Sequence, residues 1–223
     1  MQFTYDESCG SDFLEIKDEV YNYLIKARRH KIGDEIYFRN LKDNNIYLYK
    51  LDFIDKKKAL FNLISKEEKI VENKNKLHIG WCVIDPKTVE KYIASLNEMG
   101  VDKITFIYAD YSQKNFKINI DKLEKILVNS STQCGRSNII KLEVCKSLEQ
   151  FIKENNDAYF LDFSDVCVDE KSKQIKTLVV GCEGGFSKKE RETFKKDFVV
   201  GFKSNLILRS ETAIISAGAK ILL

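Results

Sequence analysis

The feature that most constrains the fold is an alternation of short apolar runs with longer amphipathic segments after residue 76. We expect four strands there, because the runs are short and rich in β-branched or aromatic residues, at 76–84, 103–109, 157–163 and 177–182. The first helical segment begins at Asp85 and Pro86 and ends at Gly100, which are start and stop signals of helices. Strands that alternate with helices predict an α/β domain with a mainly parallel sheet.

The first 70 residues have a different pattern. Two runs, 46–54 and 58–64, are β-branched and aromatic with partial alternation, which suits strands, and 19–29 has helical spacing. The stretch 65–76, SKEEKIVENKNK, is charged and has no period, so we place a domain boundary within it. The sequence therefore predicts a small β-rich domain at 1–70 and an α/β domain at 71–223.

Composition narrows the class of protein and of site. Hydrophobic residues make up 43% of the chain, yet no apolar run approaches the roughly 20 residues that cross a bilayer. The N-terminus is acidic and polar, unlike a signal peptide, so we expect a cytoplasmic protein with no membrane partner. Six widely spaced cysteines and two histidines lack the short ligand spacing of a zinc site, so we expect no metal.

A basic cluster, KARRHK at 26–31, stands out from a chain whose net charge is only +3. Such a cluster attracts phosphate backbones without reading any base, and Arg28, Arg29 and Lys31 are its candidate RNA-binding residues. A solvated surface with no ligand is the alternative reading.

A glycine turn follows the last predicted strand, in VVGCEGGFSKKE at 179–190. It matches neither the phosphate loop GxxxxGK[ST] nor the dinucleotide fingerprint GxGxxG, and Glu183 would repel a polyphosphate. Glycines let a flat ring approach the backbone closely, so the turn is a candidate ligand site, with a tight connection as the alternative. The Ser187–Glu190 pair forms a capping box that predicts a helix over 187–197.

The segment LILRSETA at 206–213 sets Arg209 and Glu211 between an apolar run and an apolar helix. Buried charges need partners, so either the two residues form a structural ion pair or their loop faces the glycine turn and completes a pocket. The terminal helix that follows, AIISAGAKILL, has small residues at 213 and 216–219, which favour close packing in a symmetric dimer.

Together, GCEGGFSKKE and LILRSETA resemble the paired C-terminal motifs of the ribosomal RNA small subunit methyltransferase E family. QCGR at 133–136, NEMGV at 97–101 and LIKARRHKIGDEI at 24–36 resemble further motifs of that family. The resemblance runs in order over nearly the whole chain, and its two C-terminal motifs are the specific ones.

The resemblance implies a fold and an activity. The fold is α/β: a C-terminal SPOUT-type domain, in which a parallel sheet with helices carries a trefoil knot, preceded by a small PUA-like β-barrel domain that holds RNA. The implied protein is a homodimer that uses S-adenosyl-L-methionine to methylate N3 of a specific uridine in 16S ribosomal RNA. Two alternatives stay open: a non-catalytic RNA-binding or ribosome-assembly factor on the same fold, and a SPOUT methyltransferase acting on another RNA.

The resemblance also assigns residues. The implied cofactor-binding residues are Gly181, Glu183, Gly184, Gly185, Asn205, Leu206 and Leu208. The catalytic candidates are Arg209, Glu211 and Arg136: Glu211 as a base for the uracil N3 proton, or an arginine that stabilises developing negative charge. The chain departs from the family at Cys182, where proline is usual, at 204–205, at 94–95 and at Tyr111, where an arginine is usual.

Overall fold

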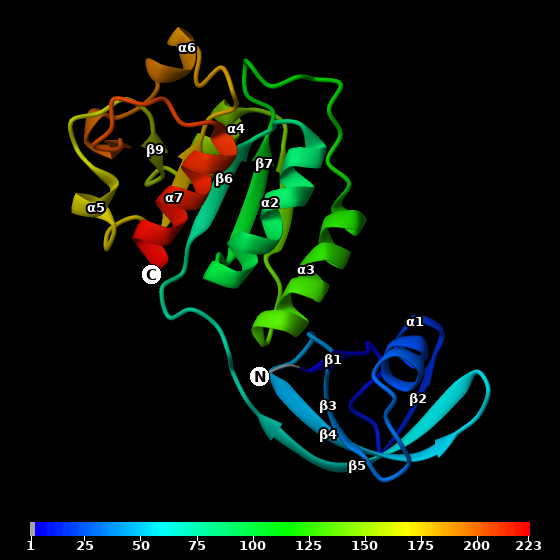
Figure 1. Cartoon of the computed structure of the whole chain (residues 1–223). Helices are drawn as coiled ribbons and strands as arrows, with labels where there is room; N and C mark the ends of the chain where they lie inside the picture. The colour runs from blue at the N-terminus through cyan, green and yellow to red at the C-terminus, as the bar shows by residue number, and fades with distance from the viewer. Residues whose placement is uncertain (1–2) are drawn as a thin grey trace. The chain divides into compact units, whose positions relative to one another are not determined.

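The computed structural model describes residues 3–223, which form two compact units (Figure 1). Unit 1 contains the described residues up to Glu72 together with Val128–Ile139, and unit 2 contains Asn73–Leu127 and Ile140–Leu223. The segment that returns to unit 1 consists of the second half of a long helix and the loop after it.

Unit 1 is built on a five-stranded sheet. In spatial order its strands are β1 (Thr4–Tyr5), β3 (Glu35–Arg39), β4 (Asn45–Ile54), β5 (Lys58–Glu68) and β2 (Phe13–Lys17). The β1–β3 pair is parallel, and the other pairs are antiparallel. A short helix, α1 (Asp18–Tyr21), continues as a π-helix over Asn22–Ala27, in the region where helical spacing predicts a helix.

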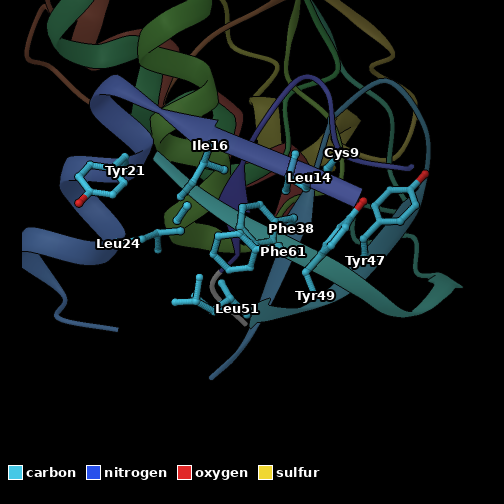
Figure 2. Packing of buried hydrophobic residues seen from close by; sticks show 12 residues of the cluster. Cys9, Leu14, Ile16, Tyr21, Leu24, Phe38, Tyr47, Tyr49, Leu51 and Phe61 are labelled. Carbon is cyan, nitrogen blue, oxygen red and sulfur yellow. The ribbon is translucent and has the colours of Figure 1, made fainter. Parts of the chain in front are cut away.

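The core of unit 1 follows from alternation along its strands. Leu14 and Ile16 of β2 are buried between exposed neighbours, as expected for a sheet with one solvated face. Figure 2 shows Phe38 against Tyr49 and Phe61, with edge-on rings whose centroids lie 5.5 and 5.4 Å apart. Such pairs add about 0.5–1.5 kcal/mol beyond the area they bury.

Unit 2 is a six-stranded sheet in which every strand pair is parallel, as the alternation of strands and helices predicts. In spatial order its strands are β11 (Val199–Val200), β9 (Tyr159–Leu161), β10 (Thr177–Val180), β6 (His78–Cys82), β7 (Lys103–Ile107) and β8 (Lys141–Cys145). Its helices are α2 (Pro86–Met99), the first half of α3 (Ile120–Cys134), α4 (Leu148–Glu154), α5 (Val168–Lys171), α6 (Lys188–Arg191) and α7 (Ser210–Leu222). No helix within residues 3–223 is long and apolar enough to cross a membrane.

The helix signals read from the sequence are confirmed. Asp85 precedes α2 and accepts a hydrogen bond from the backbone N–H of Thr88 at 3.1 Å, and Pro86 is the first helical residue. Gly100 ends α2 with φ of 92°, a left-handed conformation that favours glycine. Helix α7, red in Figure 1, packs against α2.

The helix predicted over 187–197 is much shorter than expected. Its capping box is present, but α6 ends at Arg191 and only a 3-10 turn over Lys196–Phe198 follows. Between them Phe194 stacks on Phe160 of β9, with ring centroids 3.9 Å apart, so apolar packing against the sheet replaces continuation of the helix. Strand β8 was not predicted, because its Lys and Glu residues interrupt the apolar pattern at the edge of the sheet.

Candidate functional site

A cavity of about 960 Å³ lies in unit 2, at the carboxyl ends of β9 and β10. Three segments form most of its wall: 161–165 after β9, 180–186 after β10, and 202–208 before α7. In parallel α/β sheets, ligands bind outside the carboxyl ends of the strands. The position and the volume of the cavity therefore fit a small-molecule site.

The glycine turn after β10 forms one wall of this cavity, and its geometry requires glycine. A Cβ atom on Gly181 would lie 3.1 Å from the Cα of Gly185, closer than real Cβ atoms comfortably approach backbone. Gly185 has φ of 68°, and its N–H donates to the carbonyl of Cys182 at 2.9 Å. The turn thus brings the backbone of its glycines to the cavity wall.

The segment before α7 meets the glycine turn, which is one of the two alternatives that we derived from the motif LILRSETA. The hydroxyl of Ser210 donates to the carbonyl of Gly181 at 2.6 Å and accepts from the indole N–H of Trp81 at 2.9 Å. All three residues are buried. Ser210 therefore joins the start of α7 to the turn and to β6, a role that its place in LILRSETA does not reveal.

The buried carboxylate of Glu190 holds the residues that follow the glycine turn. Oε1 of Glu190 accepts from the backbone N–H of Asp110 at 2.9 Å, and Oε2 accepts from the backbone N–H of Ser187 at 2.8 Å. The Ser187 hydroxyl donates in turn to Oδ2 of Asp110 at 2.6 Å. The capping box predicted from sequence therefore also ties the loop after β7 to the loop after β10.

Arg191 connects two of the segments that form the cavity wall. Its Nε and Nη2 donate to the two carboxylate oxygens of Asp162 at 2.6 and 3.0 Å, and its Nη1 donates to the carbonyl of Phe186 at 2.6 Å. The hydrogen bonds with Asp162 raise the pKa of Arg191 above its usual value. A two-pronged pair of this kind holds the loop after β9 against the glycine turn.

The structure brings the predicted cofactor residues together. They all line the one cavity: Gly181, Glu183, Gly184, Gly185, Asn205, Leu206 and Leu208. The carboxylate of Glu183 is exposed, and Leu206 is 77% exposed. An apolar side chain so open to water at a cavity wall gains from contact with a bound ligand.

Arg209 and Glu211 flank the cavity. They do not form the structural ion pair that was the other alternative for this motif. Arg209 is exposed, and within residues 3–223 no ion pair joins it to Glu183 or Glu211. Glu211 is only 8% exposed, and its Oε2 has no hydrogen-bond partner in the part of the chain that the structure describes. A buried carboxylate oxygen left unpaired is costly, and such sites often serve function.

The remaining predicted residues belong to unit 1. Arg136 is 5% exposed, does not line the cavity, and donates from Nε to Oδ1 of Asn138 at 2.6 Å. Arg28, Arg29 and Lys31 are exposed at the end of the π-helix.

Comparison with known proteins agrees with both halves of the chain. Residues 71–222 match the RNA methyltransferase domain, and residues 16–64 match the RNA methyltransferase PUA domain. The ribosomal RNA small subunit methyltransferase E of Helicobacter pylori is 37% identical over 218 residues, which cover 96% of each chain.

Solved structures share the fold. The ribosomal RNA small subunit methyltransferase E of Neisseria gonorrhoeae, bound to S-adenosyl methionine, superposes with a TM-score of 0.79 at 16% identity, covering 98% of this chain and 95% of that one. A Legionella pneumophila protein, described as a methyltransferase in complex with SAM, has a TM-score of 0.79 at 24% identity, with 98% and 95% coverage. The sequence match, the two domain matches and the shared fold show that this chain belongs to the ribosomal RNA small subunit methyltransferase E family.

Proposed function

We propose that this protein transfers the methyl group of S-adenosylmethionine to N3 of one uridine in the 16S ribosomal RNA of the small subunit. Membership of the family makes the chain an RNA methyltransferase that uses this cofactor. The uridine and the N3 position are the parts that we add, and they rest on the motif resemblance together with the site.

One observation carries the assignment of the cofactor site: the glycine turn and the 202–208 segment line the same cavity. Gly184 and Gly185 offer backbone groups that a flat adenine ring can approach. Phe163 and Leu206, each 77% exposed, provide apolar surface at the same cavity. The residues present therefore fit S-adenosylmethionine, and we assign its binding to the seven residues predicted from sequence.

The chemistry that these residues must support is a methyl transfer to a weakly acidic nitrogen. When bound, S-adenosylmethionine would supply the methyl group from its sulfonium and leave as the neutral thioether S-adenosylhomocysteine. We assign removal of the N3 proton to Glu211, because its Oε2 is buried and unpaired and because it shares the first turn of α7 with the cavity residue Ser210. A proton acceptor needs a free oxygen.

The negative charge that develops on the uracil oxygens needs a cation. We favour Arg209 for this role over Arg136, since Arg209 is exposed beside the cavity segment and makes no ion pair with Glu183 or Glu211, whereas Arg136 is buried and hydrogen-bonded to Asn138. Arg28, Arg29 and Lys31 would hold phosphates of the same RNA from unit 1.

The proposed assembly is a cytoplasmic homodimer with the trefoil knot of the SPOUT class. Gly218, one of the small residues that favour a dimer in the sequence reading, lies against α2 of its own chain, 3.5 Å from Met99 when a Cβ is added. The remaining support is the family resemblance. Light scattering at micromolar concentration should give twice the chain mass, and a monomer would refute this assembly.

Two measurements test the proposed function. Calorimetry in the presence of a chelator should show binding of S-adenosylhomocysteine, which a protein of another class would not bind. Single-turnover transfer of labelled methyl to small subunits should then fall on the order of 100-fold in Glu211→Gln, with cofactor affinity unchanged, while exposed Glu192→Gln serves as the matched control. Cofactor binding without any transfer by the wild-type chain would favour the ribosome-assembly alternative.

A further inference from the structure

An exposed tyrosine stands beside the cofactor turn. Tyr111 follows β7, and 54% of its surface is open to solvent. Its ring lies against Gly184: a Cβ atom added to that glycine would meet Cδ2, Cβ and Cγ of Tyr111 at 3.2, 3.3 and 3.4 Å. The tyrosine therefore covers part of the turn from outside, since it is not one of the residues that line the cavity.

The backbone on both sides of Tyr111 is held in place. The N–H of Asp110 donates to buried Glu190 at 2.9 Å, and the Asp110 carboxylate accepts from Ser187 at 2.6 Å. On the other side, the N–H of Ser112 donates to the carbonyl of Ala109 at 3.0 Å, and Ser112 is 6% exposed. A half-exposed ring is thus presented by an ordered loop.

Within residues 3–223 the ring of Tyr111 forms no aromatic pair with another side chain, and its hydroxyl interacts electrostatically with Arg191 of the cavity wall. An exposed aromatic surface that is fixed beside a reaction site is suited to a flat ligand.

We propose that Tyr111 is a positioning residue on which the target uracil stacks after it leaves the RNA stack. This inference rests on the proposed function. Enzymes that modify a base must extrude it or take it from a single strand, and an aromatic side chain replaces part of the stacking energy that the base loses. Gly184 both lines the cavity and contacts Tyr111, so the ring stands beside the wall that we assign to the methyl donor.

The test compares Tyr111→Phe, which keeps the ring, with Tyr111→Leu, which removes it. Methyl transfer to small subunits purified from cells that lack this gene gives kcat and KM, and calorimetry gives the affinity for S-adenosylhomocysteine. Loss of one stacking contact should lower kcat/KM of Tyr111→Leu on the order of 5- to 100-fold. Tyr111→Phe should stay within about twofold of the wild type, because stacking does not need the hydroxyl. Cofactor affinity should be unchanged in both variants.

Tyr92→Leu is the matched control, since Tyr92 is a partly exposed tyrosine on α2 away from the cavity wall. Unchanged kcat/KM in Tyr111→Leu would overturn the inference. So would an equal loss in Tyr111→Phe, which would make the hydroxyl the working group, or a parallel loss of cofactor affinity, which would place the ring in the cofactor site.

Failure of the proposed function can be distinguished from failure of the stacking proposal by testing the wild-type chain. A wild-type chain that transfers no methyl would refute that function, and equilibrium binding to the same small subunits would then decide about Tyr111. Binding weakened in Tyr111→Leu but not in Tyr111→Phe supports stacking, and equal binding of all three chains refutes it.

Discussion

The buried carboxylate of Glu190 offers a sharp test of how the site is held together. Replacement by glutamine keeps the size of the side chain and removes its charge. Oε1 and Oε2 each accept from a backbone N–H, of Asp110 and Ser187, at 2.9 and 2.8 Å. In Glu190→Gln one acceptor becomes an NH₂ group, so one of these N–H donors faces another donor inside the protein.

The expected cost follows from those two bonds. A hydrogen bond to a charged group contributes about 1.5–3 kcal/mol, and a buried donor left unpaired costs about 1–3 kcal/mol. Glu190→Gln loses one of these hydrogen bonds and weakens the other, because its acceptor is no longer charged. Burial of a neutral side chain is easier and offsets part of this loss. The free energy of unfolding should therefore fall by about 2–3 kcal/mol.

Urea unfolding followed by tryptophan fluorescence measures this loss of stability in unit 2. Trp81 is the single tryptophan of the chain, is fully buried and belongs to β6, so its fluorescence reports unit 2. Glu192→Gln, an exposed change two residues away, should alter the unfolding free energy by less than about 0.5 kcal/mol. Equal midpoints for Glu190→Gln and the control would refute the tie between the two loops.

Three further predictions concern single residues. Burial, with Lys103 nearby, lowers the pKa of His78 to about 4, so the unfolded state binds more protons than the folded state between pH 6.5 and 4. The free energy of unfolding of unit 2 should therefore fall by about 2 kcal/mol as the pH falls through that window. In His78→Gln, urea unfolding should show a smaller dependence of this free energy on pH. Gly201→Ala should destabilise unit 2 by about 3 kcal/mol, since its Cβ would lie 2.8 Å from the carbonyl oxygen of Ser164; a thermal melt matching the wild type would contradict this. Arg209→Ala should cut the single-turnover rate on the order of 100-fold and spare cofactor affinity, and unchanged chemistry would remove Arg209 from the catalytic set.

The sequence predicts the local parts of this structure well. The caps of α2, the capping box before α6 and the parallel sheet all come from short-range spacing of polar, apolar and glycine residues. The seven residues that we propose for the cofactor were predicted because two short motifs resemble those of a known family, and all seven line one cavity.

The sequence does not predict the ties between distant segments. Asp110 and Glu190 are 80 positions apart, and Trp81 and Ser210 are 129 apart. Their contacts depend on the spatial order of the strands, which places β10 beside β6 and which no local pattern encodes. Within residues 3–223 Arg209 makes no ion pair with Glu211, which was one of the two alternatives left open by the sequence; residues near in sequence need not face each other where a loop ends and α7 begins.

The central claim is that this chain methylates N3 of a uridine, and the product can be identified directly. Small subunits from cells lacking the gene would be incubated with the purified chain and S-adenosylmethionine, and the 16S ribosomal RNA digested for nucleoside mass spectrometry. We expect a gain of 3-methyluridine that the Glu211→Gln chain does not produce. A methyl group on another nucleoside, or at another position of uridine, would contradict it.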